Sequence, residues 1–195
     1  MPNTPPVLRL QRQLSESEVA RQINIKAAAR ELVSEVGYEA STVRGIACRA
    51  GVAPATVYRY YTSKDYLLYE VMIDWASGTV EALGHLTYVG TPVERVSHAF
   101  QTIIEMAVDD LNLLTAGVAS FRSPDTWIHG MSTWQELFTA FATPACGDDP
   151  PHDLDARAMV LGHVLIACFL NLTAGRTSVG DACAVINTAA SYAFA

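Results

Sequence analysis

Apolar residues recur at steps of three and four positions along most of the chain, the spacing that places side chains on one face of an α-helix. The first such stretch is formed by Val19, Ile23, Ala27, Leu32 and Val36 together with their apolar neighbours. Gly37 follows directly, and glycine readily adopts the left-handed conformation that ends many helices. The pattern predicts a first helix over about residues 17–36.

Two short helices are expected next, separated by a tight turn. One follows Ser41 and Thr42 and ends at Gly51, and the other begins at Pro54 and runs to about Tyr61. Proline is favoured in the first turn of a helix. Helices of this length are unstable alone in water, so both depend on packing against neighbouring elements.

The rest of the chain continues the helical pattern. Thr91-Pro-Val-Glu94 is a start signal, because threonine caps a helix, proline suits its first position and glutamate reaches back to the cap. Residues 143–151 hold three prolines and predict a loop. Six further helices are expected over about residues 63–84, 91–109, 111–121, 125–142, 153–174 and 178–195. We predict an all-α protein with about nine helices and no sheet.

The helix expected over residues 153–174 is almost wholly apolar in its second half. A membrane span needs about twenty apolar residues, and His163, Asn171 and the charged first turns shorten this run. A helix that is apolar on most faces is buried on more than one side. The pattern therefore predicts burial in a core or at a subunit interface, with no membrane partner.

Charge is divided unevenly along the chain, although half of the residues are apolar and only 17% are charged. The net charge of -7 combines about +4 over residues 1–64 with about -11 over residues 65–195. A basic part can approach a polyanion while an acidic part stays in solution. The alternative is a chance excess of charge on solvated faces.

No metal, cofactor or catalytic site is predicted. The four cysteines are widely spaced, without a Cys-x-x-Cys pair or a histidine at metal-ligand spacing. No nucleophile elbow, phosphate-binding glycine loop or metal-spaced histidine pair occurs in the sequence. The first 14 residues lack the apolar core of a signal peptide, so we expect a cytoplasmic protein that is not an enzyme.

The two short helices and the turn between them have the spacing of a helix-turn-helix. Stretches over residues 25–32, 37–47 and 50–67, the last containing Thr56-Val-Tyr-Arg-Tyr-Tyr61, closely resemble the DNA-binding domain of the TetR family of repressors. We expect a flexible arm over residues 1–16. The resemblance implies a helix-turn-helix domain over 17–64 and a ligand-binding and dimerisation domain over 65–195, in a repressor that a ligand releases from a palindromic operator.

The resemblance implies contacts with double-stranded DNA for eight residues: Thr42, Arg44, Pro54, Ala55, Thr56, Tyr58, Tyr60 and Lys64. Thr42 would cap its helix and touch a phosphate, and Arg44 would reach a guanine edge or, as the alternative, a phosphate. Pro54 and Ala55 would pack on thymine methyls. The remaining hydroxyl and ammonium groups would bind phosphates. Core packing is the alternative for the tyrosines and is preferred for Tyr61.

Three residues depart from the usual pattern of the family, one of them Tyr61, which replaces the more frequent phenylalanine. Ala53 stands where a capping side chain is common, at a cost of about 1 kcal/mol, and Gly45 inside a helix costs about as much. Because the third helix has few long polar side chains, we expect modest base readout and reliance on phosphate contacts and DNA shape. Arg9 and Arg12 would add minor-groove contacts.

The family resemblance implies a homodimer formed by the last two long helices, over about 153–174 and 178–194. The apolar run over residues 159–172 agrees, because a lone bundle would expose much of it; burial in a monomeric core is the alternative. An effector site is expected among the middle helices, and ordinary core is the alternative for each of its residues. The candidates are Phe100, Ile104, Phe121, Trp127, Trp134, Phe138, Met159 and His163.

This aromatic set favours a hydrophobic or aromatic effector. The stretch from Asn112 to Gly117 and the following segment resemble actinobacterial repressors of steroid and lipid breakdown, some of which answer to coenzyme A thioesters. The phosphates of a thioester would need cations, for which Arg122, Arg157 and Arg176 are candidates; Glu105, Asp109 and Asp110 would instead suit a lipophilic cation. The alternative function is a helical ligand-binding or interaction protein without DNA-binding activity.

Overall fold

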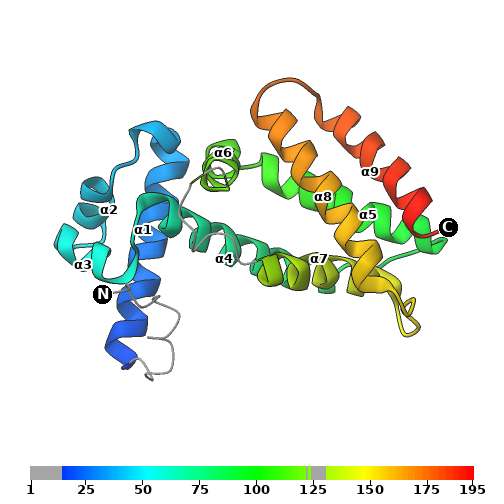
Figure 1. Ribbon diagram of the computed structural model, residues 1–195, viewed down its shortest axis with the longest axis horizontal. Coiled ribbons are helices and arrows are strands. Elements are labelled where there is room, and N and C mark those ends of the chain that lie inside the picture. The colour runs from blue at the N-terminus through cyan, green and yellow to red at the C-terminus, as the bar shows by residue number, and fades with distance from the viewer. Residues whose placement is uncertain (1–14, 122, 124–130) are drawn as a thin grey trace, which may run out of the picture.

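The computed structural model describes residues 15–121, 123 and 131–195. Within these ranges the chain forms nine α-helices and no strand, which confirms the predicted all-α class (Figure 1). The helices are α1 (Glu16–Ala40), α2 (Val43–Arg49), α3 (Pro54–Tyr60), α4 (Lys64–Gly84), α5 (Pro92–Val108), α6 (Leu111–Ser120), α7 (Met131–Cys146), α8 (Leu154–Thr173) and α9 (Val179–Ala193). We call α1–α3 the head and α5–α9 the body, and α4 runs from one to the other. The predicted arm lies almost wholly outside the described residues.

Helix α1 buries a different face from the one predicted. Its buried residues are Ile25, Ala28, Ala29 and Val33. Val19, Ile23 and Val36, which belong to the predicted stripe, are exposed. Both sets follow helical spacing, and the buried side is the one against which α2, α4 and α6 pack. The predicted face is therefore wrong, because a helix with apolar residues on two sides does not itself determine which side meets its neighbours.

The predicted end of the first helix is confirmed at Gly37. This residue has a φ of 78° and interrupts the helical conformation of α1, as a residue without a Cβ can at little cost. One further turn leads to Ser41, whose hydroxyl donates a hydrogen bond of 2.7 Å to the Gly37 carbonyl. The break redirects the chain toward α2.

The head has an apolar core that extends into α4 and α6. Ile46 and Val57 of the head are buried together with Leu67 of α4 and Leu113 of α6. Further along α4, Leu83 belongs to the core of the body. Because α4 supplies side chains to both cores, a movement of this helix changes the packing of the head and of the body together.

The predicted helix starts are confirmed at three caps. Thr91 and Glu94 form a reciprocal capping box at the start of α5, as predicted. Ser178 and Asp181 do the same at α9, and the Ser63 hydroxyl accepts a hydrogen bond from the Tyr66 amide at α4. Such caps satisfy backbone amides that have no partner within the helix.

Helix α7 runs further than the sequence indicates. The predicted loop over residues 143–151 begins only at Gly147, which has a φ of 73°, because α7 continues through Pro144 to Cys146. Proline lacks the amide proton that would bond back by one turn. Since only two helical residues follow it, the cost is confined to the last turn, and the predicted helix end at residue 142 is wrong.

Gly162 of α8 lies against the ring of Phe138 on α7. A Cβ built at this glycine would stand 2.2 Å from two ring carbons of Phe138. We expect Gly162→Ala to lower the free energy of unfolding by about 1–3 kcal/mol, the usual cost of overpacking a core. Urea denaturation followed by circular dichroism measures this change.

A matched control for this prediction is Gly78→Ala in the middle of α4, where no atom lies within 4 Å of the added Cβ. Alanine there is expected to stabilise the helix by about 0.5–1 kcal/mol. Equal effects of the two substitutions would contradict the close approach of α7 and α8.

Candidate nucleic-acid interface and effector core

Helix α3 presents a surface of small and hydroxyl-bearing residues. Val57 and Tyr61 are buried, at 1% and 4% exposure, and hold the helix against the head. Pro54, Ala55 and Tyr58 are exposed on the opposite side. Thr56 and Tyr60 are half-buried. The helix therefore offers most of its predicted DNA-contacting residues to solvent, and the expected core position of Tyr61 is confirmed.

Helix α2 begins beside this surface. The Thr42 hydroxyl accepts a hydrogen bond of 3.0 Å from the Gly45 amide, which confirms the predicted cap. A Cβ at Gly45 would lie 3.0 Å from Leu32 Cδ2 of α1. Gly45 is thus more than a cost to helix stability, because it permits α2 to pack closely on α1.

The turn between α2 and α3 is fixed from two sides. Gly51 has a φ of 65°, and the Val52 amide donates to the Ala47 carbonyl at 2.9 Å. The side chain of Asn24 in α1 donates a hydrogen bond of 2.8 Å to the Ala50 carbonyl. The sequence gives no signal for Asn24, because its partner lies 26 positions away and is a backbone atom.

The two arginines of α2 have different surroundings. Arg49 forms two hydrogen bonds with Glu35, of 2.6 and 2.5 Å, and a 3.8 Å ion pair with Glu31. The Arg49 guanidinium also holds the pKa of Glu35 below its ordinary value through this hydrogen bond. Arg44 is exposed and, among the residues that the structure describes, has no hydrogen bond or ion pair. Of the two arginines of α2, only Arg44 can therefore contact an incoming ligand without first breaking a bond to a residue that the structure describes.

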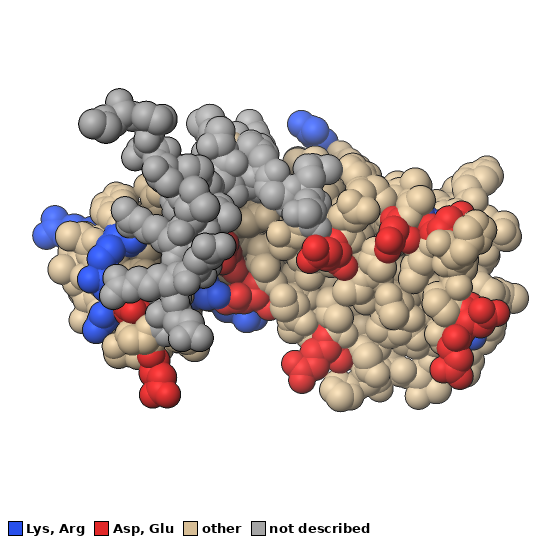
Figure 2. Space-filling model, turned by 60° about the horizontal axis from the view of Figure 1, so that its bottom comes forward, with Lys and Arg blue, Asp and Glu red and all other residues tan. Residues whose placement is uncertain are grey.

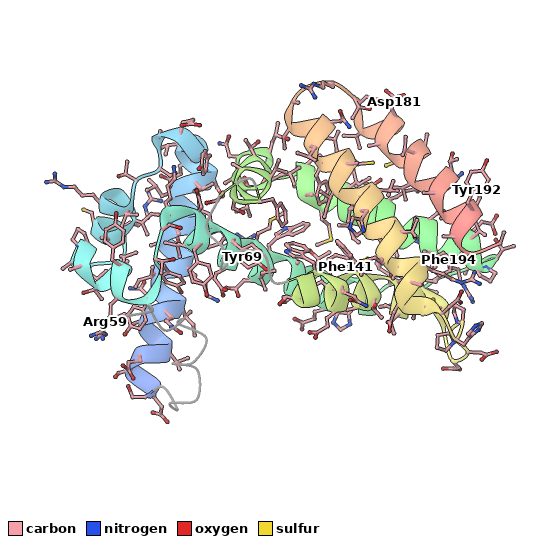
Figure 3. All side chains as sticks on the ribbon, in the orientation of Figure 1. Arg59, Tyr69, Phe141, Asp181, Tyr192 and Phe194 are labelled. Atoms are coloured by element: carbon pink, nitrogen blue, oxygen red, sulfur yellow. The ribbon has the colours of Figure 1, made fainter. Side chains whose placement is uncertain are left out.

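Basic residues gather at the head end of the molecule. Figure 2 shows most Lys and Arg side chains there, whereas Asp and Glu side chains are spread over both the head and the body. Arg59 extends from α3 away from the rest of the chain (Figure 3). Its guanidinium donates a 2.6 Å hydrogen bond to the Tyr60 hydroxyl and lies 4.8 Å from the Tyr60 ring centroid. Arg9 and Arg12 lie outside the described residues.

Lys64, at the first position of α4, is half-buried, and its ammonium contacts Tyr38. Its ammonium donates a 2.9 Å hydrogen bond to the Tyr38 carbonyl and lies 3.8 Å from the Tyr38 ring centroid. The Tyr38 hydroxyl donates in turn to the Asp65 carboxylate at 2.6 Å. Burial raises the pKa of Tyr38 to about 12, and the hydrogen bond to Asp65 and the nearby carboxylates add to the effect.

In the body, the structure brings together three of the residues predicted to bind an effector. The ring of Trp134 lies 4.9 Å from that of Phe121 and 5.9 Å from that of Phe138. Tyr69 of α4, which was not predicted, joins them at 6.3 Å from Trp134. The indole N–H of Trp134 is buried and makes no hydrogen bond of normal geometry with the described residues, although it lies near enough to the Tyr69 hydroxyl to act against the rise that burial causes in the pKa of Tyr69.

The other predicted effector residues differ in their surroundings, although Phe100 and Ile104 share the core of the body with Phe138. Phe100 and Ile104 are fully buried, and Phe100 packs edge-to-face on Phe141 at 6.4 Å. Met159 is half-buried and His163 exposed, although the His163 ring lies 6.1 Å from Phe138. Trp127 lies outside the described residues. A recess at the junction of α4, α5 and α6 contains none of the predicted aromatic and apolar residues but does contain Asp110, one of the acidic candidates. It is lined by Met72, Trp75, Ala107, Asp110, Leu113 and Leu114.

Two of the charged residues considered for effector binding have structural partners. Arg157 forms a 2.7 Å ion pair with Asp153 and donates a 2.6 Å hydrogen bond to the Ala193 carbonyl at the end of α9. Asp110 caps α6 and accepts a hydrogen bond from the Ser34 hydroxyl. Arg176, Glu105 and Asp109 are exposed, and Arg122 lies outside the described residues.

Helices α8 and α9 lie side by side (Figure 1), and several large apolar side chains of the two helices are exposed. Tyr192 of α9 is 86% exposed and points outward (Figure 3). The other large exposed apolar residues of the two helices are Val160, Leu170, Val179 and Val185. By length and composition alone α8 could cross a membrane, as core helices of many proteins could.

Comparison with protein families identifies the head. The sequence-family model described as "Bacterial regulatory proteins, tetR family" matches residues 25–71. This range extends from α1 through the α2–α3 turn into α4. It contains all eight predicted DNA-contacting residues.

Named relatives are similar over different lengths. An uncharacterized HTH-type transcriptional regulator of Mycobacterium tuberculosis is 34% identical over 97 residues, which are 49% of this chain and 44% of that protein. The match to this relative thus spans less than half of its length. The HTH-type transcriptional repressor KstR of Mycolicibacterium smegmatis is 35% identical over 175 residues, covering 86% of this chain and 83% of that protein. Both relatives are named as transcriptional regulators rather than enzymes.

Solved structures share the fold. A TetR transcriptional regulator from Rhodococcus sp. RHA1 aligns with a TM-score of 0.75 at 22% identity, over 88% of this chain and 95% of that chain. FadR of Thermus thermophilus, solved in complex with lauroyl-CoA, aligns with a TM-score of 0.68 at 20% identity, over 88% and 92% of the two chains.

Proposed function

Because the chain belongs to the TetR family of bacterial transcriptional regulators, we propose that it is a cytoplasmic, homodimeric repressor. It binds operator DNA through the head and is released by a small hydrophobic ligand in the body. The observation that carries this proposal is the outward side of α3, where Pro54, Ala55 and Tyr58 stand exposed above the buried Val57. Small residues let a helix enter a major groove, and hydroxyl groups bind phosphate oxygens.

Titration of fluorescent duplexes tests DNA binding. The probes are the region upstream of the gene and a shuffled duplex of the same length, each measured by anisotropy over a range of KCl concentrations. We expect the upstream duplex to bind more tightly, with an affinity that falls steeply with salt. Absence of salt-dependent binding to both duplexes would contradict the repressor and favour a helical ligand-binding protein.

The effector site is proposed at the aromatic cluster of Tyr69, Phe121, Trp134 and Phe138. These rings offer apolar contacts, and the unpaired indole N–H of Trp134 would donate to an oxygen atom of the ligand.

FadR of Thermus thermophilus was solved with lauroyl-CoA, so an acyl-CoA is the first class to test. A ligand that releases the operator must bind the DNA-free state more tightly than the DNA-bound state. Release of the fluorescent duplex by lauroyl-CoA would support this class, and binding without release would exclude it as the inducer.

The dimer is proposed to form through the exposed apolar residues of α8 and α9. An apolar face on two neighbouring helices is typical of subunit interfaces with two-fold symmetry. A dimer would also supply two heads, as required by operators with two half-sites about one helical turn apart.

Leu170 of α8 is 44% exposed on this face. We expect Leu170→Glu to weaken the dimer by about tenfold or more, since a charge within an apolar interface loses its water without gaining a partner. Sedimentation velocity over a range of concentrations measures the dissociation constant. The control is Leu86→Glu, because Leu86 is similarly exposed, at 37%, but follows the end of α4. Equal behaviour of the two variants would contradict the proposed interface.

A further inference from the structure

Tyr38, Lys64 and Asp65 form a small polar cluster where the end of α1 meets the start of α4. The Tyr38 hydroxyl donates to Asp65 Oδ1 at 2.6 Å. The Lys64 ammonium donates to the Tyr38 carbonyl at 2.9 Å and lies over the Tyr38 ring. Adjacent side chains on a helix ordinarily point apart, yet Lys64 and Asp65 converge here on one tyrosine.

The cluster keeps two opposite charges apart. Within the part of the chain that the structure describes, Lys64 forms no ion pair, and its partners are a neutral carbonyl and the face of a ring. The carboxylate that could neutralise it belongs to the next residue and accepts from the Tyr38 hydroxyl instead. No carboxylate among the described residues therefore neutralises Lys64, and N–H donors that do not bind the Tyr38 carbonyl remain for other partners.

An uncompensated ammonium is favourable for binding DNA. Each phosphate that a protein neutralises releases counterions and makes binding more dependent on salt. A lysine already paired with a carboxylate would have to give up that pair before binding phosphate. The Tyr38 hydroxyl is protonated near neutral pH, as tyrosine ordinarily is, and burial together with the Asp65 carboxylate raises its pKa further, to about 12.

We propose that Tyr38 is a positioning residue for DNA binding: by holding the Asp65 carboxylate, its hydroxyl leaves the charge of Lys64 free to contact a DNA phosphate. The inference rests on the proposed operator binding and adds to it. It assigns Tyr38 a role beyond packing in the head, because the Tyr38 hydroxyl keeps the Asp65 carboxylate from neutralising Lys64.

The test measures operator affinity against KCl concentration for the full chain and for Tyr38→Phe, Lys64→Ala, Asp65→Asn and the double variants. Tyr38→Phe removes only the hydroxyl, so that Asp65 becomes free to pair with Lys64. We expect affinity to fall by about fivefold, and the slope of log K against log [KCl] for the dimer to become shallower by about 1.8, which is about 0.9 for the one phosphate contact in each of the two heads. Lys64→Ala should give the same loss of slope, and Tyr38→Phe should add nothing further to that variant.

The decisive comparison is the effect of Asp65→Asn in two backgrounds. Removing a negative charge near DNA raises affinity in any background, but an amide cannot neutralise Lys64. The gain must therefore be larger in the Tyr38→Phe chain than in the wild type, and it must restore the salt slope. Circular dichroism and thermal melting confirm that each variant is folded.

The possible outcomes separate the two proposals. An unchanged slope in Tyr38→Phe, or equal gains from Asp65→Asn in both backgrounds, would leave Tyr38 with a packing role only and overturn this inference while operator binding stands. An unchanged slope in Lys64→Ala would also overturn it. A wild-type chain without salt-dependent DNA binding would overturn both proposals.

Discussion

Replacing Phe100 by alanine is expected to lower the free energy of unfolding by about 3–5 kcal/mol, the range for truncating a buried phenylalanine. Phe100 is fully buried in α5, and its ring meets that of Phe141 at 6.4 Å in an edge-to-face arrangement. The loss is a large fraction of the total stability of a typical domain, about 5–15 kcal/mol. Urea denaturation followed by circular dichroism measures it.

The control for this prediction is Glu105→Ala, which changes an exposed residue of the same helix. Its effect is expected to stay within about 0.5 kcal/mol. A small loss for Phe100→Ala, together with a lost response to the effector, would instead place Phe100 in a ligand site with room around it. The experiment thus separates the two interpretations that the sequence leaves open for this residue.

The helices were predictable where the signal is local. Thr91 and Glu94, like Ser178 and Asp181, satisfy the amides at a helix start from within four residues, so their pattern can be found without tertiary information. Gly37 ends the regular part of α1 for a similarly local reason. Glycine has no Cβ and therefore adopts a positive φ at little cost.

The errors arise where tertiary packing decides the result. Ile23 and Val33 both fit helical stripes on α1, but Val33 is buried and Ile23 is 60% exposed. Pro144 indicates a loop, yet it lies within α7, two residues before its end. Gly45 was expected only to cost stability, but it permits α2 to approach Leu32. For Ile23 and Gly45 the neighbouring helix, which local pattern does not identify, determines the outcome, whereas Pro144 is tolerated because only the last turn of α7 lies beyond it.

The candidate site was predictable by residue type and less so by arrangement. The family pattern named Lys64, but nothing in the sequence indicates that Tyr38, 26 positions away, supplies its hydrogen-bond acceptor. The bond from Asn24 to the Ala50 carbonyl has the same separation and was missed for the same reason. Contacts between distant positions depend on the crossing of helices, which periodicity alone does not fix.

Arg44→Ala is expected to weaken binding to the operator by about 10- to 100-fold and to reduce the preference for one base pair. A guanidinium that pairs with a guanine edge contributes about 1–3 kcal/mol of discrimination. Arg44 is exposed on α2 and, within the described residues, is without a hydrogen bond or ion pair. No bond within the chain has to break before it meets a base, so its loss should affect affinity and leave stability unchanged. Anisotropy titrations against the operator and single-base variants measure both effects.

The matched control is Arg49→Ala in the same helix, because Arg49 is already held by Glu35 and Glu31. Its removal should lower stability only slightly, as for other exposed ion pairs, and should leave base preference unchanged. A uniform loss of affinity for all duplexes in Arg44→Ala would indicate that Arg44 contacts a phosphate instead of a base. Equal losses of affinity in both variants would mean that positive charge on α2, rather than the free side chain of Arg44, determines binding.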